Sequence, residues 1–152
     1  MSSRFITLLF FLNLLVGHTS AQTNDDRFEK QKEYNSKIQQ HSLKIKYGES
    51  RTQKEHVQNS EEIGKNLDSA VTNHEEIKKT MSKRQMNEAK ENHAAIEKHH
   101  ADAKKHHQAI QMELSKPKHS EMAVRHHAAH VSTSLEKAEK EESTIQEKTK
   151  KK

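Results

Sequence analysis

The chain has 152 residues, with no Cys, no Trp, two Tyr and four Phe, and 32% of its residues are charged. This stock of large apolar side chains is too small to fill a β-sandwich or an α/β core, whereas helices with narrow apolar stripes need little of it. The absence of Cys excludes disulfides and thiolate metal sites, and the net charge of +5 comes mostly from interspersed Lys and Glu. We therefore expect an all-α protein of one domain.

The N-terminal 21 residues have the pattern of a secretory signal peptide. Arg4 provides a positive start, residues 5–16 are almost wholly apolar, and Thr19, Ser20 and Ala21 suit a cleavage site. The apolar run is too short and wrongly flanked for a spanning helix, and no later segment should insert stably into a membrane. We expect an exported protein, periplasmic or extracellular, and an uncleaved N-terminal anchor is the alternative.

Two helices are predicted between residues 23 and 81. Residues 23–26 (TNDD) form a helix-start cluster, because their side-chain oxygens satisfy free amides and acids suit the positive helix end. Gly48 should end this first helix, since Gly readily takes positive φ. Its stripe is loose and consists of Phe28, Tyr34, Ile38, Ser42 and Ile45. The second helix should begin near Ser50. Its stripe alternates steps of four and three residues: His56, Ser60, Ile63, Leu67, Ala70, His74, Ile77 and Met81.

A turn is expected at residues 81–84, because the stripe changes phase between Met81 and Met86 by more than a continuous helix absorbs. Ser82 with Gln85 three residues later is a capping-box pattern that favours a new helix. The third helix should run to about Leu114 and end before Pro117, which lacks an amide donor. Its stripe alternates steps of three and four residues: Met86, Ala89, His93, Ile96, His100, Ala103, His107, Ile110 and Leu114.

A fourth helix is predicted after Pro117. Its apolar positions are Val124, Ala128, Val131, Leu135, Ala138 and Ile145. Four amphipathic helices with short connections are most simply arranged as an up-down-up-down four-helix bundle. We assign residues 22–147 to this bundle and residues 148–152 to a basic disordered tail. The sequence leaves open whether one chain or a dimer of hairpins forms the bundle.

Histidines are concentrated in the second half of the chain. Nine of the thirteen lie between residues 93 and 130, and three of them occupy the stripe of the third helix one heptad apart. If the last two helices pack antiparallel about Pro117, His107 faces His127, with the i,i+4 pair His126 and His130 within reach. At the opposite end His74 should be level with His93. The candidate metal ligands are His93, His99, His100, His106, His107, His119, His126, His127 and His130.

Imidazole in this density indicates metal chemistry. Neutral imidazole is the commonest transition-metal ligand and suits Cu(II), Ni(II) and Zn(II). The thioethers of Met112 and Met122, expected near the same end of the bundle, add a preference for Cu(I). Two other interpretations stay open, in which the histidines are satisfied polar core residues or form a pH switch between about pH 5 and 7.

Two segments also resemble a known family. Residues 92–104 (NHAAIEKHHADAK) and 125–130 (RHHAAH) are similar to the His-Ala-rich helical repeats of the small metal-binding proteins, exported bacterial proteins with a signal peptide and no Cys. The resemblance covers mainly residues 86–140. It implies a helical bundle that binds several divalent ions, copper prominent among them, in the periplasm. This chain has fewer histidines before residue 86 and more lysines than that pattern.

Other classes of function have weaker support. A ferritin-like di-iron enzyme needs two Glu-x-x-His motifs, and Glu97 with His100 supplies only one, so we do not expect an enzyme. Nucleic-acid binding is not expected either, because no aromatic residues accompany the basic tail. The alternative is a helical interaction protein whose Lys-rich faces bind anionic partners or surfaces. The favoured hypothesis is an exported helical protein that binds several divalent ions, copper first and nickel or zinc next, for metal buffering or tolerance.

Overall fold

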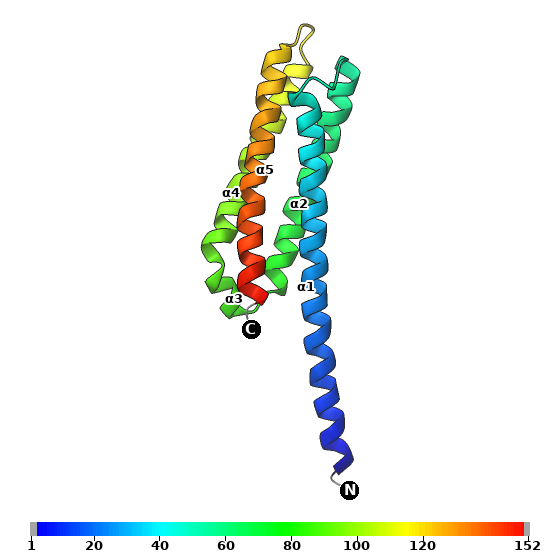
Figure 1. The fold of residues 1–152 in the computed structure, drawn as a ribbon, viewed down its shortest axis with the longest axis vertical. Coiled ribbons are helices and arrows are strands. Elements are labelled where there is room, and N and C mark those ends of the chain that lie inside the picture. Colours follow the sequence, from blue (N-terminus) through cyan, green and yellow to red (C-terminus); the bar gives the residue numbers. More distant parts are fainter. Residues whose placement is uncertain (1–2, 151–152) are drawn as a thin grey trace.

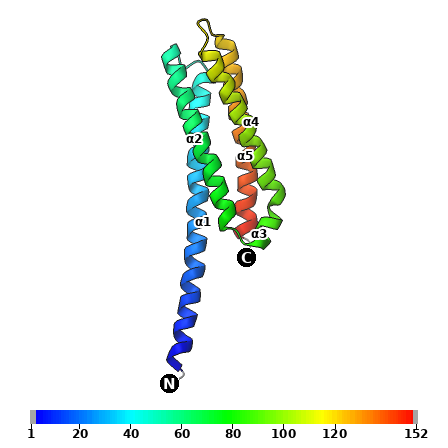
Figure 2. The same ribbon diagram turned by 180° about the vertical axis from the view of Figure 1, so that it is seen from behind.

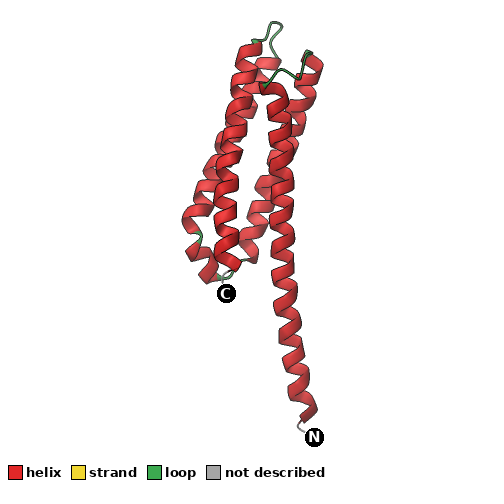
Figure 3. Ribbon diagram, in the orientation of Figure 1, coloured by secondary structure: helices red, strands yellow, loops and turns green. Residues whose placement is uncertain are grey.

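The computed structural model describes the backbone of residues 3–150 and the side chains of residues 24–150. This part of the chain is all-helical and contains no strand (Figure 3). The five helices are α1 (Ser3–Lys46), α2 (Gln53–Thr80), α3 (Lys83–Glu88), α4 (Lys90–Leu114) and α5 (Glu121–Lys150). The prediction of an all-α helical bundle is confirmed.

The four long helices pack as neighbours around a common interior. α1 contacts α2 and α5, and α4 contacts the same two helices, so the contacts close a ring (Figures 1 and 2). The N-terminal part of α1 extends beyond the bundle (Figure 1). The predicted signal peptide covers residues 1–21, and the side chains of these residues are outside the described part of the chain. Among the described residues, no helix combines the length and apolar character that crossing a membrane requires.

The structure has five helices where the sequence predicts four, because the expected third helix is divided at Ala89. The turn at residues 81–84 is confirmed, and Ser82 caps α3 through a capping box with Gln85. At the break, Lys148 Nζ donates to the Glu88 carbonyl oxygen at 3.1 Å. Lys148 belongs to α5, which is helical through Lys150, although the sequence predicts a disordered tail from residue 148.

Two other helix starts differ from expectation. α1 passes through residues 23–26 without a break, so no helix begins there in the chain as described. Asn24 instead accepts a hydrogen bond from the Thr80 hydroxyl at the end of α2. α2 starts at Gln53, three residues after the predicted position, because Thr52 and Glu55 form its capping box.

The interior consists of two apolar clusters separated by polar side chains. The stripes predicted for α2 and α4 are buried, except that Met86 is only half-buried. In α1, the positions three and four residues apart are Phe28, Gln31, Asn35, Ile38, Ser42 and Ile45, and all are buried. Tyr34, which the sequence analysis placed on this stripe, packs at its edge. Asn35, His74 and His100 lie between the two apolar clusters on their helices.

The connections at the other end of the bundle follow the predicted breaks. Gly48 has φ of +72° and follows α1, as expected for a helix C-terminus. Residues 115–120 join α4 to α5 around Pro117, and Ser120 Oγ accepts a hydrogen bond from the Ala123 amide. The Arg125 side chain of α5 lies directly against Gly48, so the two connections are packed together.

Replacing Gly48 by Ala should lower the free energy of unfolding by about 1–3 kcal/mol, because an L-residue is strained at positive φ. A Cβ at Gly48 would also lie 2.6 Å from Arg125 Nη2, so Arg125 must move. Urea unfolding measures the change. Glu49→Ala, at the exposed next position, is the control and should change stability by less than about 0.5 kcal/mol. Equal stability of Gly48→Ala and wild type would contradict the described loop.

Candidate metal centre

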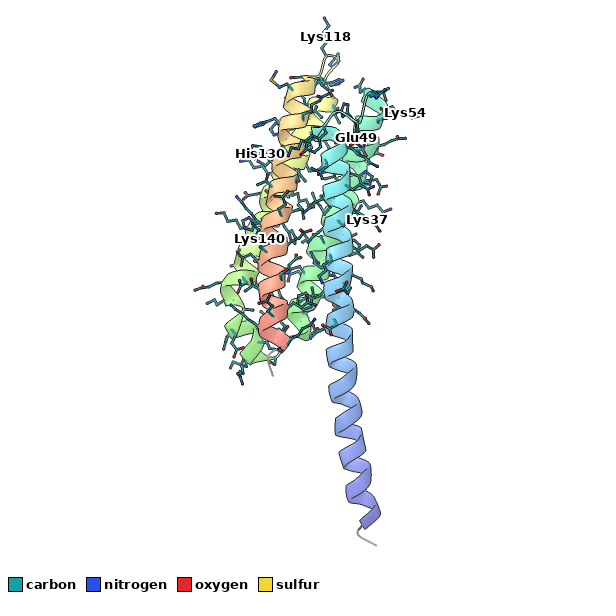
Figure 4. All side chains as sticks on the ribbon, in the orientation of Figure 1. Lys37, Glu49, Lys54, Lys118, His130 and Lys140 are labelled. Carbon is teal, nitrogen blue, oxygen red and sulfur yellow. The ribbon has the colours of Figure 1, made fainter. Side chains whose placement is uncertain are left out.

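Four imidazoles from α4 and α5 meet on one side of the bundle. This surface histidine cluster comprises His106, His126, His127 and His130. The Nδ1 atoms of His106 and His127 are 3.1 Å apart, and the His106 and His130 rings are stacked with centroids 4.4 Å apart. His126 lies edge-on to His130, at 4.6 Å between centroids. Figure 4 labels His130 on α5, on the outside of the bundle.

The electrostatics of this cluster favour neutral rings. Partial burial, together with the charges of neighbouring histidines, lowers the pKa of His106 and of His127. Neutral rings offer one lone pair each, which is the form that binds a metal ion. Two ligands of one tetrahedral ion at 2.0–2.1 Å lie roughly 3.4 Å apart. The two Nδ1 atoms lie 3.1 Å apart in a hydrogen bond, in which one neutral ring donates to the other, and an ion that replaced the shared proton would find them close to that spacing.

The structure corrects the position of His107. The sequence analysis predicted that His107 faces His127, but His106 occupies that place. His107 is buried and its Nε2 lies 2.7 Å from the Ser60 carbonyl oxygen of α2, to which it donates. The reason is geometric: His107 is on the stripe that faces the bundle interior, and the neighbouring position is rotated by about 100° towards α5. A Cβ at Gly64 would lie 2.6 Å from His107 Cε1, so Gly64 makes room for this ring.

A second group of imidazoles lies inside the bundle. This interior histidine cluster comprises His74 of α2 with His93 and His100 of α4. His93 Nδ1 and His74 Nε2 are 3.3 Å apart, which confirms that the two residues are level. The rings of His74 and His100 are edge-on, with centroids 5.9 Å apart. The Met81 sulfur lies 3.2 Å from His93 Nε2.

A buried carboxyl group, Glu142 of α5, adjoins the interior histidine cluster. Its Oε2 accepts a hydrogen bond from Asn35 Nδ2 at 2.8 Å. Its Oε1 lies 3.9 Å from His100 Nε2, and neither Oε1 nor His100 Nε2 has a hydrogen-bond partner. Burial raises the pKa of Glu142 to about 8 and lowers the pKa of His100 to about 4. Burial, aided by the charges of His93 and His100, lowers the pKa of His74 to about 3. At neutral pH this interior therefore carries no charge.

The remaining candidates stand apart from both clusters. His99 is half-exposed on α4 and makes no ring contact with another histidine among the described residues. His119 is half-exposed in the connection before α5, 4.0 Å from Glu121. Met112 and Met122 are 70% and 81% exposed, near that same connection. In the described part of the chain, no three His, Asp or Glu side chains already stand as a group able to hold a metal ion.

Sequence reasoning missed the buried polar residues Gln31, Asn35 and Glu142. The signal was present, because steps of three and four residues from Phe28 pass through both amides, and the same steps in α5 run from Ala138 to Glu142. These positions were omitted because their side chains are polar. At these positions the three- and four-residue spacing predicts burial correctly, whereas side-chain polarity does not.

Comparisons with known proteins contribute no further information. No protein-family model, curated protein or solved structure matches the chain. The resemblance to the small metal-binding proteins therefore stays a hypothesis that depends on residues 86–140 alone.

The unfolding free energy should be greatest at pH 6.5–7 and fall on both sides. Below pH 6.5 the unfolded chain protonates histidines that stay neutral when folded, His74 down to about pH 3, so stability is lost as pH falls. Above pH 4.5 the unfolded chain ionises Glu142, which stays protonated when folded up to about pH 8, so stability is lost as pH rises. More histidines have a lowered pKa than carboxyl groups have a raised pKa, so the histidines determine how the unfolding free energy changes below pH 6.5.

Glu142→Gln isolates the alkaline effect. This variant should lose the decline between pH 7 and 8, which is about 1 kcal/mol for one carboxyl whose folded pKa is about 8, and keep the acid decline. Urea unfolding in the presence of a chelator measures both. Glu136→Gln, on the exposed side of α5, should behave as wild type. An unchanged alkaline decline in Glu142→Gln would show that Glu142 ionises normally in the folded protein.

Proposed function

We propose that this protein binds divalent transition-metal ions through histidines, with the surface histidine cluster as its main site. The observation that carries the proposal is the approach of four imidazoles from α4 and α5, with two Nδ1 atoms 3.1 Å apart. His126 and His130 are exposed, so rotation of their side chains would direct further nitrogen atoms towards an ion held by His106 and His127. Copper is the preferred ion because imidazole binds it most strongly among the divalent metals, and nickel or zinc comes next.

The proposed role is metal buffering or tolerance outside the cytoplasm. An exposed cluster exchanges ions with solvent more readily than an enclosed site, and two or more ions per chain are expected from the number of histidines. The exposed thioethers of Met112 and Met122 add ligands suited to Cu(I). We further propose that residues 1–21 act as a signal peptide. The mature protein is then a bundle of four long helices in the periplasm or extracellular space.

The alternative, an interaction protein that uses Lys-rich faces, has less support from the described surface. Seven lysines of the described residues pair with a carboxylate, which reduces the charge they offer to a partner. These pairs include Lys32–Glu29, Lys78–Glu97, Lys79–Glu76 and Lys104–Asp68.

The double change His126→Ala/His130→Ala should weaken Cu(II) binding at the tightest site at least tenfold and remove most of the metal-induced rise in Tm. It deletes two rings that contact each other and His106. Calorimetric titration and thermal melting measure these effects. The matched control is His41→Ala/His99→Ala, which removes two half-exposed histidines outside the cluster. Equal losses from both doubles would indicate a diffuse array of weak sites.

Binding should also weaken steeply below about pH 6, because protons compete for the imidazole lone pairs. Titrations of wild-type protein with Cu(II) at pH 5, 6 and 7.5 measure this dependence. Since the lowered pKa of His106 and of His127 delays their protonation, these rings should hold metal to lower pH than free imidazole would. Affinity that is unchanged at pH 5 would indicate carboxylate ligands instead.

A further inference from the structure

A separate combination of ligands lies at the end of the bundle where α4 joins α5. His56 of α2, His119 of the connection and Glu121 of α5 come together there. We propose that these three residues form a second divalent-cation site, with two imidazoles and one carboxylate. It uses no residue of the surface histidine cluster, so it stands or fails independently of the proposed function.

The three side chains do not yet stand at the distances of ligands to one ion, but a small movement of one of them would bring them there. Glu121 Oε2 lies 3.0 Å from His56 Nε2 and 4.0 Å from His119 Nε2, so one carboxylate oxygen faces both rings. Ligand atoms 2.0–2.1 Å from one ion are separated by roughly 3.0–3.4 Å in octahedral or tetrahedral geometry. His56 and Glu121 already satisfy this separation. His119 is too distant by roughly 0.6 Å and belongs to the connection between helices, where a small shift costs little.

The two nearer ligands are held in place before any ion binds. The His56 side chain is 2% exposed and is fixed within α2, while Glu121 lies in the first turn of α5. Arg125 Nε donates to Glu121 Oε1 at 2.9 Å, and this oxygen also lies 3.1 Å from His56 Nε2, so both carboxylate oxygens face His56 while Oε2 also approaches His119. Partners that orient a ligand in this way commonly tune metal sites. Glu121 and His119 are partly exposed, so an ion can reach them from solvent.

The chemistry of this site differs from that of an all-imidazole cluster. Two histidines with one carboxylate leave coordination positions open for water and suit zinc, cobalt or ferrous ions. The ion would also connect three segments, since α2, the connection and α5 each supply one ligand. A structural ion pair between His56 and Glu121 is the competing explanation, and the experiment must separate the two.

The test uses the full-length protein with His106, His126, His127 and His130 all replaced by Ala, here called the cluster-free variant. Co(II) titration followed by visible absorption reports the number and type of ligands, and Zn(II) calorimetry reports affinity. We expect the cluster-free variant to retain one such ion per chain. Adding Glu121→Gln or His119→Ala should weaken that binding at least tenfold. Adding Glu136→Gln, on the exposed side of the same helix, should leave it unchanged.

Three results would overturn the proposal. The first is a cluster-free variant that binds no Co(II) or Zn(II), and the second is binding that Glu121→Gln does not weaken. The third is a fall in Tm on Glu121→Gln that is equal with and without Zn(II), which would identify a structural pair. The surface histidine cluster is tested separately, by comparing the Cu(II) affinity of the wild type with that of the cluster-free variant. Failure of one proposal is therefore distinguishable from failure of the other.

Discussion

The stability of this bundle depends on keeping buried polar side chains uncharged. Only 30% of the residues are hydrophobic, and the interior includes imidazoles, amides and a carboxyl group in place of larger apolar residues. Burying an ion without a partner would cost more free energy than the thin apolar stripes recover. His74 and His100 therefore remain deprotonated while Glu142 remains protonated.

Adjacent histidines serve different purposes because consecutive helical residues point about 100° apart. In the pair His106-His107, the second ring packs against Ser60 inside the bundle and the first meets His127 outside it. In the pairs His99-His100 and His106-His107 the second ring is thus buried and the first is not, whereas His126 and His127 both belong to the surface histidine cluster. The interior rings of His74, His93 and His100 contact one another between α2 and α4, and in the surface histidine cluster His126 and His130 are exposed.

The sequence predicted the helical class, the breaks at Gly48, residues 81–84 and Pro117, and the buried stripes of α2 and α4. These features depend on local chemistry and on strict periodicity, which act over a few residues. The pairing of His106 rather than His107 with His127 was not predictable from heights along the helices alone, because it also depends on how each helix is rotated. The association of His56 with Glu121 joins residues 65 positions apart and required the three-dimensional arrangement. The buried positions of Gln31, Asn35 and Glu142 were not predicted because polar side chains were expected to be exposed.

The short helix α3 has a practical consequence. None of its six residues is buried, and it joins two long helices at the end of the bundle opposite Gly48. Exposed segments of this kind tolerate insertions and attached groups better than packed ones. Lys83 and Asn87 are exposed, and both stand at the end of the bundle away from the surface histidine cluster. A fluorescent label attached at Lys83 or Asn87 would therefore avoid Met86, the residue of α3 that packs against the core, and would stand away from the surface histidine cluster.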